Sequence, residues 1–229
     1  MKSKGIIICL CDITGIMAKP WIENGYEAIL VDPQHPEGVH VDGAITRVGH
    51  IIDHPETWSV LRKAIASGRV VFVMGFPPCT DLAVSGARWF ETKRTADPAF
   101  QHKAMHVVWQ CQIIGQMSGA PWAFENPVSQ ISTLWRRSDF SFHPYEFTEY
   151  EPGDNYTKKT CLWVGGGFVM PPAKAIESLG KPDNTRIWYG GKSIKDRANF
   201  RSATPLGFAI AVFESNAPHL RISEVENAA

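Results

Sequence analysis

Residues 69–79 read RVVFVMGFPPC, a run of branched and apolar side chains that ends in two prolines and a cysteine. A continuous run of this kind is typical of a strand that is buried on both faces of a sheet. The two prolines mark a sharp turn directly after it. The sequence therefore predicts a buried strand that leaves Cys79 in the turn at its end.

Strands and helices alternate on both sides of this run. Apolar segments predict further strands at residues 5–11, 26–33, 42–53 and 120–127. Helical spacing and helix-end residues predict helices at 18–25, 55–68, 98–117 and 204–215. This alternation is typical of the α/β class, so we expect a doubly wound sheet. After about residue 153 the pattern becomes irregular, with glycines and prolines that mark loops.

The chain of 229 residues carries 23 basic and 23 acidic residues, so its formal net charge is zero. A neutral protein has no overall positive field that would draw it to nucleic acid. Any nucleic-acid site must therefore be a local basic patch, or the substrate must be small. Five scattered cysteines are typical of reduced thiols rather than of a disulfide framework. With no long apolar stretch and no leader pattern, we expect a soluble, cytoplasmic protein without a membrane partner.

Polar side chains follow several of the predicted strands at the point where each strand ends. Ligands of open α/β sheets bind outside the carboxyl ends of the strands. Taken singly, these residues have ordinary explanations, such as a core cysteine, a surface acid or a helix cap. Together they predict one crevice, lined by Asp12, Thr14 and Gly15 after the first strand, Asp32 after the second, Cys79, and Glu125 with Asn126.

Residues 76–86, FPPCTDLAVSG, resemble the Pro-Cys motif of the DNA cytosine-5 methyltransferases. In that family the glycine of a Ser-Gly pair follows seven residues after the cysteine, and Ser85 with Gly86 matches this spacing. Residues 124–127, FENP, are similar to the family's Glu-Asn-Val motif, with Pro127 in place of valine. The resemblance therefore covers both predicted strand ends that carry the reactive side chains.

Two further stretches extend the resemblance toward the N-terminus. Residues 10–15, LCDITG, are similar to the family's opening cofactor loop. Residues 43–48, GAITRV, are similar to its Gly-Asp-Ile element, with Ala44 at the position of the aspartate that touches adenine in the family. All matches come in the family's order over roughly residues 5–130.

The resemblance implies a Rossmann-like methyltransferase sheet that binds S-adenosyl-L-methionine. Asp32 would hold the ribose hydroxyls of this cofactor. The other residues that the resemblance assigns to the cofactor are Asp12, Thr14 and Gly15, near its methionine portion, and Pro77 with Pro78.

The resemblance also implies methyl transfer to carbon 5 of cytosine. Addition of the Cys79 thiolate to carbon 6 would turn the ring into an enamine, which can attack a methyl sulfonium. Glu125, if protonated, would donate to ring N3, and Asn126 would help to hold the site together. Ser85 is assigned to the substrate. The sequence does not name the base that removes the C5 proton.

The second half of the chain is short for this family. Residues 156–165, YTKKTCLWVG, resemble a degenerate form of its basic motif, with Lys158 and Lys159 in place of arginines. About forty residues separate this motif from the closing segment at 201–216, too few for the usual target-recognition domain. The resemblance thus implies a compact, phage-like member that lacks a full recognition domain.

We expect three parts in the chain. Residues 1–150 would form the cofactor-binding and catalytic α/β domain, 151–200 a small, irregular basic lobe, and 201–229 a helix that returns to the first domain, with a tail. Phosphates would be held by basic residues of the lobe, and bases would stack on Trp188 or Tyr189. These basic residues are Arg186, Lys192, Lys195, Arg197 and Arg201.

Three functions remain open from the sequence. The resemblance favours DNA, duplex or single-stranded, as the substrate, whereas zero net charge favours a free cytosine nucleotide such as dCMP. The third is a methyltransferase-like protein that binds without catalysis. A protonated Glu125 suits cytosine N3, which accepts a hydrogen bond, better than uracil N3. His102 and His106 lie four residues apart on a helix, but nothing completes a metal site, so we expect none.

Overall fold

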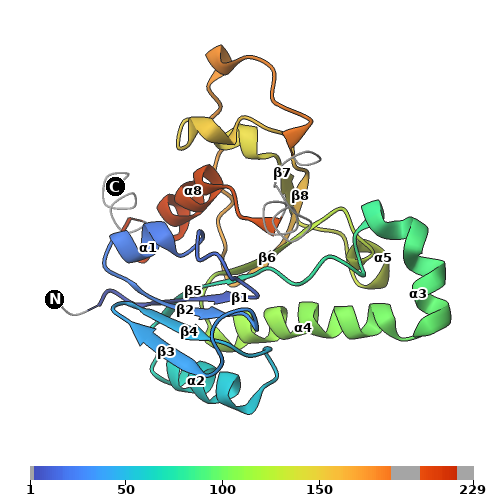
Figure 1. Cartoon of the computed structure of the whole chain (residues 1–229). Coiled ribbons are helices and arrows are strands. Elements are labelled where there is room, and N and C mark those ends of the chain that lie inside the picture. The colour runs from blue at the N-terminus through green and yellow to red at the C-terminus, as the bar shows by residue number, and fades with distance from the viewer. Residues whose placement is uncertain (1–2, 187–201, 221–229) are drawn as a thin grey trace.

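The computed structural model describes residues 3–186 and 202–220, which form a mixed α/β fold around one eight-stranded, mostly parallel sheet. The strand order is β3-β4-β2-β1-β5-β6-β8-β7 (Figure 1). The strands are β1 (Ile6–Leu10), β2 (Glu27–Val31), β3 (Val39–Asp42), β4 (Ile45–Val48), β5 (Val70–Gly75), β6 (Trp122–Pro127), β7 (Phe140–Phe142) and β8 (Thr160–Gly165).

Helices cover both faces of the sheet (Figure 1). The α-helices are α1 (Lys19–Glu23), α2 (Pro55–Ala66), α3 (Phe90–Ala96), α4 (Phe100–Ser118), α5 (Ile131–Leu134) and α8 (Leu206–Asn216). Short 3₁₀ helices are η1 (Val84–Trp89), η2 (Pro144–Phe147), η3 (Pro152–Asp154) and η4 (Glu177–Leu179). Within the described residues, no helix is both long enough and apolar enough to cross a membrane.

The alternation of side chains along β1 explains the two layers of helices. Ile6, Ile8 and Leu10 belong to the apolar cluster that α2 and α4 cover. Ile7 and Cys9 belong to the cluster on the opposite face, under α1 and α8. Successive side chains of a strand point to opposite faces, so a strand that is apolar throughout must be covered on both.

The topology places a crevice beside β1. The chain first builds β2 and β4 on one side of β1, and then returns to place β5 and β6 on the other. β1 is parallel to both β2 and β5, so all these strands end at the same edge of the sheet. The switch in direction lies between β1 and β5, and ligands of doubly wound sheets bind at this switch point.

The expected α/β fold is confirmed, but three strands were not foreseen. β3 is an antiparallel edge strand paired with β4. β7 has only three residues, and β8 lies between β6 and β7, antiparallel to both. The segment 151–200 was expected to form an irregular lobe, yet its described part contributes β8 to the sheet. The boundaries of the three expected parts stay a prediction.

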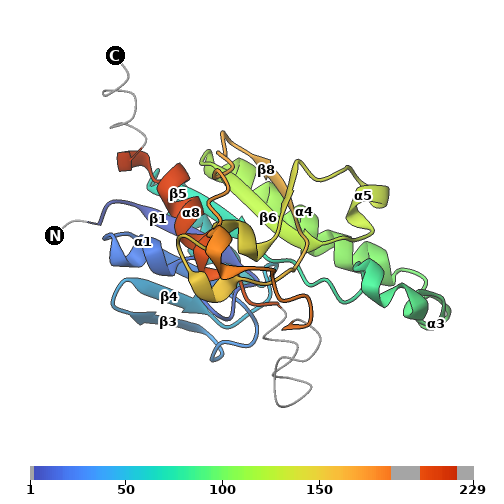
Figure 2. The ribbon, with the colours of Figure 1, turned by 90° about the horizontal axis from the view of Figure 1, so that it is seen from above.

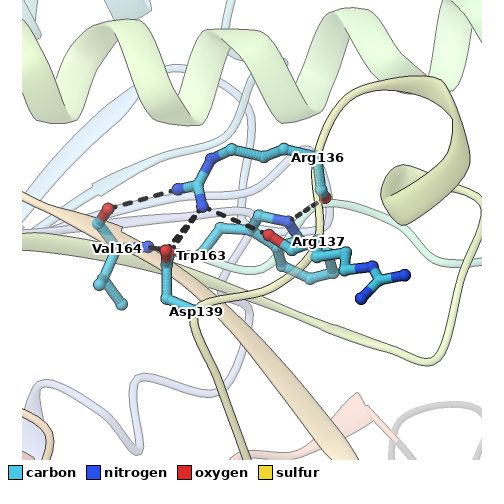
Figure 3. A network of polar contacts seen from close by, with 5 residues as sticks. All are labelled: Arg136, Arg137, Asp139, Trp163 and Val164. Atoms are coloured by element: carbon cyan, nitrogen blue, oxygen red, sulfur yellow. Dashed lines mark hydrogen bonds and ion pairs between the residues drawn. The ribbon is translucent and has the colours of Figure 1, made fainter.

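A network of polar contacts fixes the chain after α5 to β8 (Figure 3). Arg136 Nη1 donates to both carboxylate oxygens of Asp139, at 2.7 and 2.8 Å. Asp139 Oδ2 also accepts from the Val164 N–H at 2.8 Å, and Trp163 Nε1 donates to the Arg136 carbonyl at 2.9 Å. Partial burial acts to raise the pKa of Asp139, but the hydrogen bonds from Arg136 and Val164 outweigh it and hold this pKa below its ordinary value.

We expect Asp139→Asn to destabilise the protein by about 1 kcal/mol at neutral pH, since the pair is one-third exposed and partly screened by solvent. A carboxyl whose pKa is lowered by folding contributes stability above its unfolded pKa and loses it as the pH falls through the folded pKa. The difference between variant and wild type should therefore shrink below about pH 4. Urea unfolding at several pH values measures it, with Glu91→Gln on the exposed surface as control. A difference that persists unchanged in acid would contradict the assignment.

Candidate functional site

The loop after β1 is organised by Asp12. Its side chain is 4% exposed, and Oδ1 accepts hydrogen bonds from the Thr14 N–H, the Thr14 hydroxyl and the Gly15 N–H at 2.8–2.9 Å. Gly15 has a φ of +66°, in the left-handed region that favours glycine. Burial, with a smaller contribution from Asp32, raises the pKa of Asp12 above its ordinary value, although these hydrogen bonds act to lower it.

The loop after β2 lies against the loop after β1. The Asp32 N–H donates to the Val48 carbonyl at the end of β4, and Asp32 Oδ1 accepts from the Gln34 N–H at 2.8 Å. His35 Nε2 donates to the Asp12 carbonyl at 3.0 Å, which joins the two loops. Asp12 and Asp32 are thus neighbours at the carboxyl edge of the sheet, as predicted from the strand ends.

A hollow of about 420 Å³ opens at this edge, between the strand ends and α4. Its size falls in the range of small-molecule sites. Its walls include Cys11 after β1, Asp32 and Pro33 after β2, Ile51, Ile52 and Asp53 after β4, Pro78 after β5, and His106 and Val107 of α4. The structure therefore brings Asp32 and Pro78, two residues assigned to the cofactor, to one hollow.

Two other residues assigned to the cofactor line a different hollow. Thr14 and Gly15 border a space of about 320 Å³ on the side of α1, together with Leu30, Ile45 and Arg47. The loop after β1 thus stands between the two hollows. Of its residues, Cys11 is the one that reaches the larger hollow.

The loop after β4 was missed as part of the site. The resemblance gave Ala44 the position that touches adenine, but Ala44 lies at the amino end of β4, where its carbonyl accepts from the Ala28 N–H at 2.8 Å. This position is at the opposite edge of the sheet from Asp32, so Ala44 cannot border the hollow. Asp53 lies in the loop after β4, as Asp32 lies in the loop after β2. An acidic residue after a strand was the sequence feature that could have predicted this part of the site. Gly49 starts the loop, and a Cβ there would lie 1.9 Å from the Pro36 carbonyl oxygen.

The turn that carries Cys79 is tied to the end of β6. Asn126 is 1% exposed, and its Nδ2 donates to the Pro77 carbonyl at 2.9 Å. The Cys79 carbonyl accepts from the Leu82 and Ala83 N–H groups at 3.0 and 2.8 Å, which closes the turn. The next residues then pair with the chain beyond β6, through an Ala83–Ser129 bridge and a Val84 N–H to Val128 carbonyl hydrogen bond.

Glu125 precedes Asn126 on β6 and has an enclosed carboxyl group. Glu125 Oε2 is buried and has no hydrogen-bond partner among the described residues. Burial raises the pKa of Glu125, and the nearby Lys158 ammonium opposes this shift in part. Lys158 itself donates to the Ala203 carbonyl at 3.1 Å, ahead of α8. Lys158 thus bonds to the chain ahead of α8 and lies near Glu125, and its assignment to the substrate stays a prediction.

Buried polar atoms without a partner gather at this edge of the sheet. Within the described residues six such side-chain atoms occur, and four of them belong to the strand ends discussed above: Asp12 Oδ2, Glu125 Oε2, Asn126 Oδ1 and Ser129 Oγ. A buried polar atom that lacks a partner costs about 1–3 kcal/mol. Such groups call for an explanation, and none of the four residues lines either of the two hollows.

The remaining residues assigned to the substrate are scattered or outside the description. Ser85 lies exposed in η1, and Lys159 is exposed just before β8. Arg186 is described and lies over the Tyr156 ring at 4.4 Å. Arg197, Arg201, Lys192, Lys195, Trp188 and Tyr189 lie outside the described residues.

One group of potential metal ligands lies near the rim of the larger hollow. It consists of His50, His54 and Glu56, and His50 Nε2 contacts Glu56 Oε2 at 2.7 Å. The two imidazole rings are stacked at 3.8 Å between centroids. Hydrogen bonds within the group already use these side chains, because His50 Nε2 bonds to Glu56 Oε2 and His54 Nδ1 accepts from the Glu56 N–H at 3.3 Å.

The fold and the strand-end geometry together define an α/β protein with a hollow of about 420 Å³ next to a cysteine turn. No protein-family model matches the chain, and no curated protein matches it. The resemblance to the DNA cytosine-5 methyltransferases therefore depends on the motifs themselves and on the geometry of the residues that carry them.

Loss of the Asn126 side chain should loosen the Cys79 turn. In Asn126→Ala the buried Pro77 carbonyl loses its donor, so we expect the free energy of unfolding to fall by about 1–3 kcal/mol. Ser129→Ala is the matched control, because it removes a buried hydroxyl that has no partner within the described residues. Urea unfolding measures both. Equal stability of Asn126→Ala and wild type would contradict the role of this hydrogen bond.

Proposed function

We propose that the protein transfers a methyl group from S-adenosylmethionine to carbon 5 of cytosine in DNA, with Cys79 as the nucleophile. The observation that carries this proposal is the attachment of the Cys79 turn to the Glu125–Asn126 strand end by the hydrogen bond from Asn126 to Pro77. A thiol, an enclosed carboxyl group and a hollow of about 420 Å³ thus share one sheet edge.

The residues around the larger hollow fit an adenosyl group. Asp32 Oδ1 is used by the Gln34 N–H, which leaves Oδ2 for a ribose hydroxyl. Pro33 and Ile52 offer apolar surface to a flat purine ring, and Pro78 joins the hollow to the Cys79 turn. Asp12 does not line this hollow, and its unpartnered Oδ2 is buried in the loop after β1. S-adenosylmethionine supplies, when bound, the electrophilic methyl group that an activated carbon 5 takes up.

The chain's own residues would activate the base and release it. The Cys79 thiolate donates an electron pair to carbon 6, the S–C6 bond forms, and the ring electrons move toward carbon 5. The raised pKa keeps Glu125 protonated to higher pH than an exposed glutamate, so its carboxyl can donate to N3 as charge develops there. When a base has removed the C5 proton, the C5–C6 double bond re-forms and the S–C6 bond breaks, which returns Cys79 as a thiolate.

A projecting arm directly after the Cys79 turn supports a polymer as the substrate. η1 and α3 extend away from the sheet at one end of α4 in both views (Figure 1, Figure 2). Trp89 on this arm is 54% exposed, and the Arg88 guanidinium lies over its ring at 5.2 Å. Exposed aromatic and cationic side chains are what bases and phosphates bind. A free nucleotide, favoured by zero net charge, remains the second candidate.

Incubation with methyl-labelled S-adenosylmethionine tests the proposal on duplex DNA, single-stranded DNA and dCMP in parallel. We expect label in DNA as 5-methylcytosine, complete loss in Cys79→Ser, and a loss of about 100-fold or more in Glu125→Gln, which cannot transfer a proton. Cys161→Ser is the control for loss of a thiol elsewhere. Label in dCMP alone would establish the second candidate. Absence of label in all three substrates would contradict the proposed methyl transfer and favour a protein that binds without catalysis.

The raised pKa of Glu125 predicts a pH-dependent gain of stability in Glu125→Gln. Because the folded protein holds this proton more tightly than the unfolded chain, wild-type stability falls as the pH rises from about 4.3 toward the folded pKa. The variant does not ionise, so its advantage should grow over this window and then level off. Urea unfolding between about pH 4 and pH 8 measures the difference, with the exposed Glu149→Gln as control. A difference that does not vary with pH would contradict the shift.

A further inference from the structure

Cys11 and Cys111 form a thiol pair next to the larger hollow. Cys11 follows β1, is half-buried and lines that hollow. Cys111 is a buried residue of α4, in the apolar cluster against which the Cys11 side chain packs. The two residues are a hundred positions apart in the sequence, so the fold itself brings the sulfur atoms together.

The local backbone holds both sulfur atoms in place. Gly75 ends β5, and a Cβ there would lie 2.8 Å from Cys111 Sγ, so Cys111 occupies the space that a side chain would fill. Gly75 is the register partner of Leu10, the residue before Cys11. Cys11 has a φ of +57°, an unfavourable conformation for a residue other than glycine, which the surrounding structure must impose. The pair is therefore a defined feature of the switch point between β1 and β5.

We propose that Cys11 and Cys111 are a modification site at which hydrogen peroxide, a two-electron oxidant, forms a disulfide between the end of β1 and α4. This proposal does not depend on the proposed function. Cys11 is the residue that peroxide reaches first, because it borders the hollow, and Cys111 is the resolving thiol behind it.

The chemistry balances in two steps. The Cys11 sulfur attacks one peroxide oxygen, the O–O bond breaks, and Cys11 becomes a sulfenic acid with release of one water. The Cys111 sulfur then attacks the Cys11 sulfur, the S–O bond breaks, and the departing hydroxide takes the Cys111 proton to leave as a second water. Two thiols lose two electrons and two protons, and peroxide is reduced to two waters.

The other cysteines make internal controls. Cys9 is buried on the opposite face of β1, in the cluster under α1 and α8. Cys161 is buried in β8. Neither lines the larger hollow, so neither is expected to react at the same rate. Cys79 is half-buried in its turn, and its replacement in Cys79→Ser prevents a competing oxidation there.

The test uses full-length Cys79→Ser treated with limiting hydrogen peroxide, then denatured, alkylated and digested without reductant. We expect a loss of two alkylatable thiols and one cross-linked peptide that joins Cys11 to Cys111. Addition of Cys111→Ser should abolish the cross-link and leave Cys11 as a sulfenic acid that dimedone traps. Addition of Cys161→Ser should leave the cross-link unchanged. Absence of the cross-link in protein whose circular dichroism matches that of the untreated wild type, or a cross-link through Cys9 or Cys161, would overturn the proposal.

A second arm separates this proposal from the proposed function. Saturating S-adenosylmethionine should slow formation of the cross-link, because a ligand in the hollow covers Cys11. An unchanged rate would overturn the placement of the cofactor in this hollow, while the disulfide itself would stand on the peptide map.

Discussion

The hydrogen bond from Asn126 Nδ2 to the Pro77 carbonyl joins the ends of β5 and β6, and the arrangement of the site depends on it. Proline has no N–H, so Pro77 and Pro78 cannot donate to the neighbouring chain, and the turn needs a partner from outside. Asn126 supplies that partner from a fully buried position. Glu125 is the preceding residue of the same strand, so its side chain points to the opposite face of the sheet from that of Asn126.

The topology decides which loops share this edge. β1 lies between β2 and β5, so the loops that begin at Cys11, Asp32 and Phe76 are neighbours although they lie far apart in the sequence. Long apolar strands covered by helices on both faces make this scaffold rigid. The scaffold can therefore hold Cys11 in the left-handed backbone conformation and bury several polar atoms without partners, although each of these features by itself destabilises the fold. Cys11 and four of these atoms lie near the ends of the strands, at the same edge of the sheet as the larger hollow.

Elements with strong periodicity were predictable, whereas positions set by tertiary contacts were not. The strand at residues 69–75 and the helix that begins near Phe100 follow from apolar patterning alone. β3 was missed because all four of its residues are exposed at an edge, and β7 because it is too short to show a period. Asp32 and Cys79 were predicted because each follows a strand. Residues 51–53, which line the larger hollow, were not predicted, because their position depends on how the loop after β4 packs against Pro36, and no local sequence pattern indicates that contact.

The last helix is held by the short segment that precedes β8. Asp154 Oδ2 accepts from the Gly207 N–H at 2.8 Å in the first turn of α8, and Lys158 Nζ donates to the Ala203 carbonyl just before it. Lys158 also lies close enough to Glu125 to lower its pKa. Lys158, which the resemblance places in the basic motif, thus bonds to the returning chain and lies near the enclosed carboxyl group. The same short segment thus bonds to the chain that leads into α8 and places a cation near Glu125, which opposes the effect of burial on the pKa of that carboxyl group.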